Sequence, residues 1–359
     1  MASGERQPSE MSRGQRATTW PIDRSANIGR EERGGVKPMQ KFARLILACA
    51  GSLAVMSGNP WAKDLTFGYV PGSMIYPYNV ATAKGFEAEA KAAGVKTVVL
   101  DPRGSVEKQG NSIDDLIAQK VDAIGFLPLD SVVAQSFVDR VSDKKIPIVA
   151  VALQVGDPVK RELRDVYPGL TALVAPDDVV EGEQAAKLAL DLLPKDRSAT
   201  IAIIEGAPGY AVVEQRIRGF KKGLDAAAQK YEIVASQPSD WTPESGQTIC
   251  QNFLTSRPDL DLIFSEADDM AIGCARAISA SGSQIKLIAT SGGSKTGNEA
   301  IAAGELSGSV CVKPEMLGRL MFKEMYAAAT NADYKKGKFV TIDLPIITKD
   351  TLAGCPAEW

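Results

Sequence analysis

From residue 65 onward, short apolar runs alternate with amphipathic helical segments. The runs hold few polar residues, as expected for strands that are covered on both faces of a sheet. Such strands, separated by helices, are typical of a parallel sheet with helices on both sides. The expected strands cover residues 65–70, 96–100, 123–127, 146–151, 200–204, 233–236, 260–264, 286–290 and 307–312. The expected helices cover 80–93, 106–119, 132–142, 179–193, 212–229, 244–255, 270–280, 297–303 and 316–329, before a last extended segment at 339–347.

The alternation is interrupted once, at residues 155–171. This segment is long and polar and contains Pro158, Pro168 and Gly169, which is typical of a connector. The pattern resumes after it. We therefore expect an α/β fold made of two doubly wound lobes, each built on a parallel sheet.

Residues 39–62 have the features of a secretory signal. Lys41 and Arg44 precede an apolar run at 45–55, and small residues follow it. The run is too short to anchor the chain permanently in a bilayer. We therefore expect a periplasmic protein that is exported through a cleaved signal peptide.

Residues 1–38 are rich in Gly, Arg, Ser and Glu and show no apolar period. We expect them to form a disordered tail or a wrongly assigned extension, with Met39 as the alternative start. They carry no weight in the prediction of the fold.

The composition argues against several classes of function. Histidine is absent, which removes the usual zinc ligand and the usual general base of Ser and Cys hydrolases. A net charge of −3 gives no basic excess to hold nucleic acid. The 44 Asp and Glu residues leave a carboxylate-dependent enzyme, such as a glycosidase, as an alternative. We expect no metal and no cofactor.

The chain has five cysteines, of which Cys49 lies in the apolar run and would leave with the signal. The other four are Cys250, Cys274, Cys311 and Cys355. In an exported protein they allow up to two disulfides in three possible pairings, which the sequence cannot rank. Buried free thiols are equally compatible with the sequence.

Ligands of doubly wound sheets bind at the carboxyl ends of the strands, in the loops that lead to helices. Tyr76 and Tyr78 flank a proline in the first such loop, and Trp241 lies in a comparable loop of the second lobe. Aromatic rings can stack on the CH faces of sugars, or they can fill a contact between lobes. Arg216 lies early in an expected helix, where it can hold hydroxyls or a carboxylate, or can be a solvated surface residue.

Three more loop positions have two interpretations each. Asp130 and Asp268 precede expected helices, so each carboxylate can accept hydrogen bonds from hydroxyls or can cap its helix. Ser291 opens the glycine-rich loop at 291–295, which lacks the spacing of a phosphate-binding loop. A plain turn and a loop with backbone donors for an anion both fit that segment.

Taken in this order, the segments resemble the periplasmic sugar-binding proteins of the ribose-binding type, which are the extracytoplasmic receptors of ABC importers. The resemblance covers nearly everything from residue 65 to residue 347. Its carriers are the segments 76–78, 122–128, 146–149, 216–220, 236–241, 257–259 and 268–273.

The resemblance implies two lobes that are joined by a three-segment hinge and close on the ligand. The N-terminal lobe would comprise 63–175 with 313–342, and the C-terminal lobe 176–312 with 343–359. The implied function is non-catalytic capture of a sugar or polyol for a membrane permease, by a monomer that binds no nucleic acid.

By the same resemblance, Tyr78 and Trp241 stack on the sugar from opposite lobes and Arg216 hydrogen-bonds to it. The residues expected at the ligand are Tyr76, Tyr78, Asp130, Gln154, Arg216, Trp241, Asp268 and Ser291. The chain departs from the family pattern after the fourth strand, where Ala152, Leu153 and then Gln154 replace an Asp-Arg pair. Such departures predict a less charged pocket that suits a smaller polyol, a modified sugar or a furanose.

Two further alternatives share this fold. Repressors of the lac type need an N-terminal helix-turn-helix, whereas residues 1–62 offer an export signal. A sensory receptor for a small signalling molecule would have the same sequence features as a transport receptor, so the sequence does not separate those two.

Overall fold

The structure, a computed structural model, describes residues 64–359. This part of the chain is built on two parallel sheets. In spatial order the first sheet contains β11 (Lys338–Val340), β5 (Ala172–Val174), β4 (Ile148–Val151), β3 (Ala123–Phe126), β1 (Thr66–Val70) and β2 (Lys96–Val99). The second contains β7 (Tyr231–Pro238), β6 (Ala199–Glu205), β8 (Leu262–Ser265) and β9 (Lys286–Ala289). All neighbouring strands in these two sheets run parallel, as the alternation predicts.

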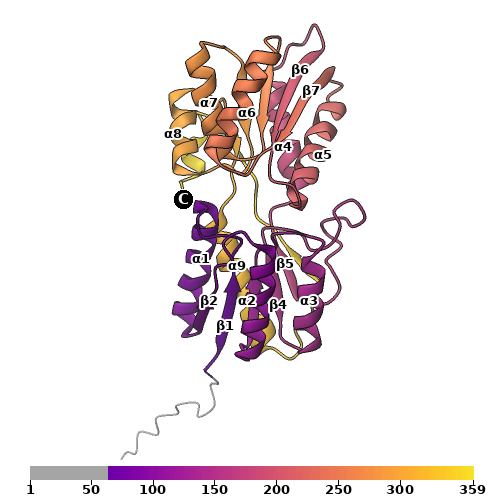
Figure 1. Ribbon diagram of the computed structural model, residues 1–359, viewed down its shortest axis with the longest axis vertical. Helices are drawn as coiled ribbons and strands as arrows, with labels where there is room; N and C mark the ends of the chain where they lie inside the picture. Colours follow the sequence, from indigo (N-terminus) through magenta and orange to yellow (C-terminus); the bar gives the residue numbers. More distant parts are fainter. Residues whose placement is uncertain (1–63) are drawn as a thin grey trace, which may run out of the picture. The chain divides into compact units, whose positions relative to one another are not determined.

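Helices cover both faces of each sheet (Figure 1). In the first lobe, α1 (Pro77–Ala93) and α9 (Pro314–Thr330) lie on one face, and α2 (Val106–Ala118) and α3 (Ala134–Asp143) lie on the other. In the second lobe, α4 (Asp178–Leu190) and α5 (Ala211–Ala226) lie opposite α6 (Pro243–Ser256), α7 (Asp268–Ser281) and α8 (Lys295–Ala303).

Strand periodicity explains why both faces are covered. In β6, Ile201 and Ile203 pack under α4 and α5, whereas Ala202 and Ile204 pack on the opposite face. Successive strand side chains point to opposite sides, so a strand that is apolar at every position needs a helix on each side. A continuous apolar run in the sequence therefore predicts a sheet that lies between two layers of helices.

The chain passes between the lobes three times. It leaves the first lobe between β5 and α4, and it returns from β10 (Ser309–Val310) to α9. It leaves again between β11 and β12 (Ile346–Ile347), which pairs with β10 in antiparallel fashion. The fold class predicted from the sequence is confirmed. We keep 63–175 with 313–342, and 176–312 with 343–359, as the proposed limits of the lobes.

The short elements differ from the sequence prediction: β5 was not expected, and the extended segment expected at 339–347 forms two separate strands, β11 and β12, in different sheets. Strand β5 follows directly on the segment predicted as a connector, and no strand was expected there. It has three residues, which is too short a run to give a periodic signal of its own. A short helix, η1 (Leu352–Gly354), follows β12.

The predicted signal peptide at 39–62 and the extension at 1–38 lie outside the described residues. Between residues 64 and 359, no helix is long and apolar enough to cross a membrane. Within the same range, no group of three or more His, Cys, Asp or Glu side chains is placed to hold a metal ion.

The four remaining cysteines form two disulfides. Cys250–Cys274 joins α6 to α7, and Cys311–Cys355 joins the second crossing to the residue that follows η1. This is one of the three pairings that the sequence allowed, and it excludes free thiols at these positions in the structure.

Candidate functional site

A cavity of about 110 Å³ lies between the lobes, beside the loops that follow the strands of both sheets. Its position is the one that doubly wound sheets use for ligands. Five aromatic side chains line it: Tyr76, Tyr78, Tyr210, Trp241 and Trp359. Its polar wall includes Arg216, Asp269 and Ser291, while Leu127, Leu153 and Val212 are among its apolar wall residues.

Tyr76 and Tyr78 reach the cavity from the start of α1. Tyr76 occupies the N-cap position and Pro77 opens the helix, where the missing proline N–H costs nothing. The Tyr76 hydroxyl donates to the backbone carbonyl of Asp240 at 3.3 Å, which joins the two lobes. Burial raises the pKa of Tyr78, so its hydroxyl remains a proton donor near neutral pH.

The position of Trp241 depends on the ring of Tyr210 and on the backbone at Gly206. Its indole meets the ring of Tyr210 edge-on, with 5.6 Å between ring centroids. A Cβ at Gly206 would fall 1.8 Å from the indole, so the ring needs a glycine beneath it. Glu266 fixes this glycine by accepting a 2.8 Å hydrogen bond from its N–H. The indole Nε1 is buried and finds no hydrogen-bond partner among the described residues.

Three cavity residues have left-handed backbones. Ala152, Trp241 and Ser291 follow β4, β7 and β9, and their φ angles are 65°, 68° and 46°. Each such non-glycine conformation costs on the order of 1–3 kcal/mol, and such residues concentrate at functional sites. The concentration of three of them around one cavity indicates that this surface is shaped for binding.

Arg216 faces the cavity from α5, and two acidic side chains of α4 and a backbone carbonyl fix its guanidinium. Its Nη2 lies 2.8 Å from Asp178 Oδ1, and its Nε lies 3.2 Å from Glu181 Oε2. Its Nη1 donates to the backbone carbonyl of Glu266 at 2.7 Å. The side chain is about 6% exposed, so the guanidinium orientation is fixed before any ligand arrives.

The close approach of α4 and α5 makes this arrangement possible. A Cβ at Gly182 would lie 2.1 Å from the carbonyl oxygen of Arg216, and one at Gly219 would lie 2.0 Å from that of Val179. Because both positions are glycine, the two helix backbones touch, and Arg216 reaches the first turn of α4.

The contacts in this cluster shift the pKa values of Asp178 and Arg216. Burial raises the pKa of Asp178 well above its usual range, and Glu181 adds to this effect against the lowering effect of Arg216. Burial alone would lower the pKa of Arg216, but Glu181 and Asp178 outweigh it and raise that pKa. Arg216 therefore stays charged, held between Asp178 and Glu181.

Five of the eight residues predicted at the ligand line the cavity: Tyr76, Tyr78, Arg216, Trp241 and Ser291. The structure does not bring Asp130, Gln154 and Asp268 to the cavity wall. Instead, their side chains form hydrogen bonds with other residues.

Asp130 closes the turn that precedes α3, because its Oδ1 accepts from the N–H groups of Val132 and Val133 at 2.8 Å each. Gln154 donates to the carbonyl of Arg161 at 2.9 Å and accepts from Gln215 of the other lobe.

Asp268 lies under α8, where it accepts from Ser309 Oγ at 2.8 Å and Ser294 Oγ at 2.9 Å. It is almost fully buried. Its partners leave no carboxylate oxygen for the cavity.

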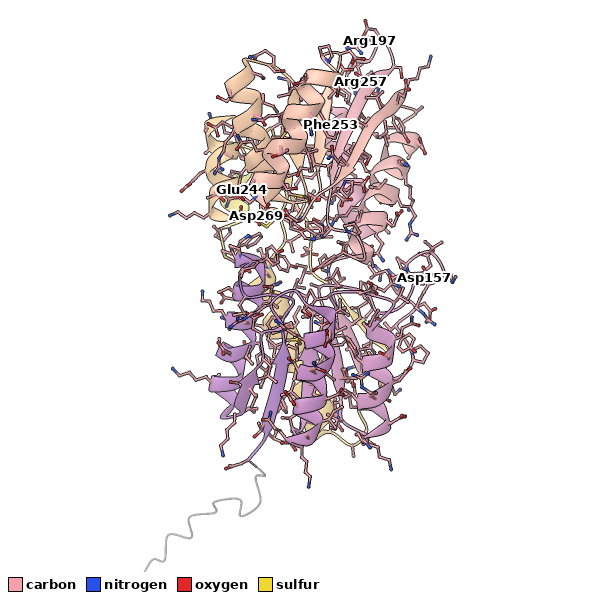
Figure 2. The ribbon with its side chains drawn as sticks, in the orientation of Figure 1. Asp157, Arg197, Glu244, Phe253, Arg257 and Asp269 are labelled. Atoms are coloured by element: carbon pink, nitrogen blue, oxygen red, sulfur yellow. A yellow bond between two sulfur atoms is a disulfide. The ribbon has the colours of Figure 1, made fainter. Side chains whose placement is uncertain are left out.

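The cavity also contains residues that the prediction lacked. Asp269 follows Asp268 in the same loop, and the sequence could not tell which of the two faces the ligand side. Figure 2 shows Asp269 at the end of the second lobe that faces the first. Tyr210 precedes α5 as Tyr76 precedes α1, and that parallel was an available signal. Trp359 follows no strand, so nothing in the sequence pattern pointed to it.

Residues 67–333 match the periplasmic binding protein domain family. The chain belongs to this family. It is 33% identical to the ribose import binding protein RbsB of Bacillus subtilis over 265 residues, which cover 74% of this chain and 81% of that protein. RbsB of Salmonella typhimurium is 30% identical over 284 residues, covering 78% and 89%.

A solved structure from Mycobacterium smegmatis in complex with β-D-fucofuranose has the same fold. The TM-score is 0.73 at 24% identity, and the match covers 81% of this chain and 93% of that one. The ribose-type resemblance seen in the sequence is confirmed. The chain therefore belongs with periplasmic binding proteins and not with enzymes, which argues against the glycosidase alternative.

Proposed function

We propose that this protein binds one small, uncharged sugar or sugar alcohol in the cavity between its lobes and delivers it to the permease of an ABC importer. One observation carries the proposal: aromatic rings from both lobes share a cavity with the fixed guanidinium of Arg216. Rings that cover the CH faces of a ligand, with a few oriented polar groups, are what a polyhydroxylated ligand needs.

The size and charge of the cavity narrow the ligand class. Its volume of about 110 Å³ is well below the roughly 300–1,000 Å³ of sites for drug-sized ligands. Asp178 and Glu181 balance the charge of Arg216, so an anionic ligand is not required. The two RbsB relatives are named for ribose import, and a pentose or a polyol of similar size suits such a site.

Each polar wall residue has a distinct role in this proposal. Arg216 donates to ring or hydroxyl oxygens from the cavity wall. Asp269 accepts hydrogen bonds from hydroxyls. Tyr78 and Trp241 stack on the carbon skeleton, while Tyr76 and Ser291 contact the rim of the ligand.

We further propose that the lobes close on the ligand as a hinge. Contacts between the lobes support this: Tyr76 with Asp240, Gln154 with Gln215, and the N–H of Ser131 with the carbonyl of Gly209 at 3.4 Å. Closure would bury the ligand and bring one face of each lobe to the permease. The proposal includes export through a signal peptide at 39–62 and a monomeric state.

Isothermal titration and thermal unfolding with D-ribose, L-arabinose, erythritol, xylitol and myo-inositol test this function. At least one compound should raise the melting temperature, since a hundredfold excess over the dissociation constant adds about 2.7 kcal/mol to native stability. Trp241→Ala should abolish that rise. Tyr231→Ala, at the opposite end of β7, should preserve it. A panel without any binding compound would contradict the proposal.

A further inference from the structure

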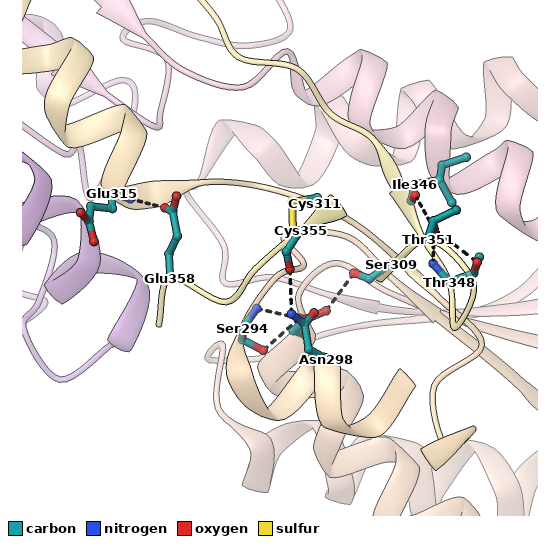
Figure 3. The surroundings of a disulfide bond; sticks show 11 residues. Ser294, Asn298, Ser309, Cys311, Glu315, Ile346, Thr348, Thr351, Cys355 and Glu358 are labelled. Carbon is teal, nitrogen blue, oxygen red and sulfur yellow. Dashed lines mark hydrogen bonds between the residues drawn. A yellow bond between two sulfur atoms is a disulfide. The ribbon is translucent and has the colours of Figure 1, made fainter. Parts of the chain in front are cut away.

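Residues 355–359, which we call the clasp, begin at a covalent anchor. The Cys311–Cys355 disulfide ties the first clasp residue to the second crossing (Figure 3). Asn298 of α8 donates from Nδ2 to the carbonyl oxygen of Cys355 at 2.9 Å. Both contacts hold the start of the clasp on the second lobe.

The end of the clasp contacts both lobes. The backbone N–H of Lys295, in the first turn of α8, donates to the carbonyl oxygen of Trp359 at 2.7 Å. On the first lobe, a Glu358 carboxylate oxygen accepts from the N–H of Glu315 at 2.8 Å (Figure 3). That N–H belongs to the first turn of α9, where amides lack helical partners and a negative charge is favoured.

Trp359 also contacts the first lobe. Its indole meets the ring of Tyr78 edge-on, with ring centroids 5.7 Å apart and planes at 78°. The same indole lines the cavity. The clasp therefore places an aromatic ring between a residue of the first lobe and the space that a ligand would occupy.

The disulfide restricts where this ring can go. Residues 356–359 belong to no helix or strand, so no regular hydrogen-bond ladder fixes them. Four residues beyond Cys355, the chain reaches at most about 14 Å even when fully extended. An anchored segment has fewer conformations to lose when it is ordered against a ligand, and such preorganisation strengthens binding.

We propose that Trp359 is a ligand-binding residue and that the Cys311–Cys355 disulfide sets the affinity of the site by holding it in place. This inference rests on the proposed function and extends it to a segment outside the strand-end loops. The remaining clasp contacts support the same placement, since Glu358 joins the clasp to α9 and Lys295 joins it to α8.

The test uses the full chain, produced under oxidising conditions, and titration calorimetry with D-ribose, L-arabinose, erythritol, xylitol and myo-inositol. Trp359→Ala should weaken the binding of any compound that the wild type binds by about tenfold. Trp359→Phe should restore part of the loss, because it keeps a ring in the same place. Cys311→Ser with Cys355→Ser should weaken binding to a similar degree.

The second disulfide provides the matched control. Cys250 and Cys274 lie in the middle of α6 and α7 and do not line the cavity, so Cys250→Ser with Cys274→Ser should leave affinity unchanged. The inference is overturned if Trp359→Ala binds within about twofold of the wild type. It is also overturned if both double-serine variants lose affinity equally. A wild type that binds none of the five compounds would instead remove the proposed function, and this inference with it.

Discussion

The carboxylates of Asp268 and Asp269, which are adjacent in the chain, have different surroundings at the start of α7. Asp268 accepts hydrogen bonds from Ser309 and Ser294 under α8, at 2.8 Å and 2.9 Å between oxygens. Asp269 lines the cavity and has no hydrogen-bond or ion-pair partner in the described part of the chain. One residue therefore stabilises the loop, and its neighbour remains available to a ligand.

Asp269→Asn should weaken sugar binding and flatten its pH dependence. Burial raises the pKa of Asp269 above its usual range, and only the ionised form is an acceptor at both oxygens. Affinity should therefore fall as the pH drops through that raised pKa. Calorimetry at a series of decreasing pH values should show this fall in the wild type, and a loss of about tenfold at neutral pH in the variant. A variant with the same slope as the wild type would contradict the assigned role.

Asp268→Asn should change how stability depends on pH. Burial raises the pKa of Asp268 to about 7, despite the hydrogen bonds from Ser309 and Ser294. The folded state therefore binds a proton that the unfolded state, with an ordinary Asp pKa near 3.9, has already lost. The free energy of unfolding should decrease as the pH rises from about 4 to about 7, with a contribution from this group of up to about 4 kcal/mol.

Urea denaturation across this pH window measures the effect. The variant should lack the part of the slope that Asp268 contributes, so the stability difference between wild type and variant should itself vary with pH. A difference that is constant from about pH 4 to about pH 7 would show that Asp268 does not titrate there.

The strand-end rule explains which site residues the sequence could predict. Tyr76, Trp241 and Ser291 follow a strand and precede a helix, and Tyr78 lies in the first turn of α1, so the topology brings them to one cavity. Arg216 was placed by its resemblance to the family pattern, because a helix-face arginine has no distinguishing spacing.

The same rule could not predict the partners that hold the site. Asp178 looks like a helix-capping residue in the sequence, yet it contacts Arg216 because α4 and α5 pack backbone to backbone. Trp359 is brought to the cavity by a disulfide whose pairing the sequence left open. Strand β5 was missed because three residues carry too little periodic signal.

Arg216→Met should destabilise the fold as well as abolish binding. It would leave Asp178 and Glu181 buried without a cation, and loss of one partner from such a buried group costs about 3–5 kcal/mol. Urea denaturation measures this directly. Arg218→Met is the control, because Arg218 is two residues along the same helix and its pair with Glu162 is exposed. That variant should lose less than about 1 kcal/mol. Equal losses in the two variants would contradict the assignment.

Gly206→Ala should disturb the site through Trp241 alone. The added methyl group would lie 1.8 Å from the indole, so the ring must leave its position or the loop must shift. We expect a loss of affinity of about tenfold or more, with a stability loss of about 1–3 kcal/mol from overpacking. Gly354→Ala is the matched control, since a Cβ there would meet no atom within 4 Å.

A double-mutant cycle separates this effect from a general distortion of the loop. In a Trp241→Ala background the added methyl group has no indole to displace, so Gly206→Ala should then cause little further change in affinity or stability. Two independent, additive losses would mean that Gly206 serves the loop, through its hydrogen bond to Glu266, and does not serve the ring. Coupling between positions in contact is commonly about 0.5–3 kcal/mol, which titration calorimetry and urea denaturation both resolve.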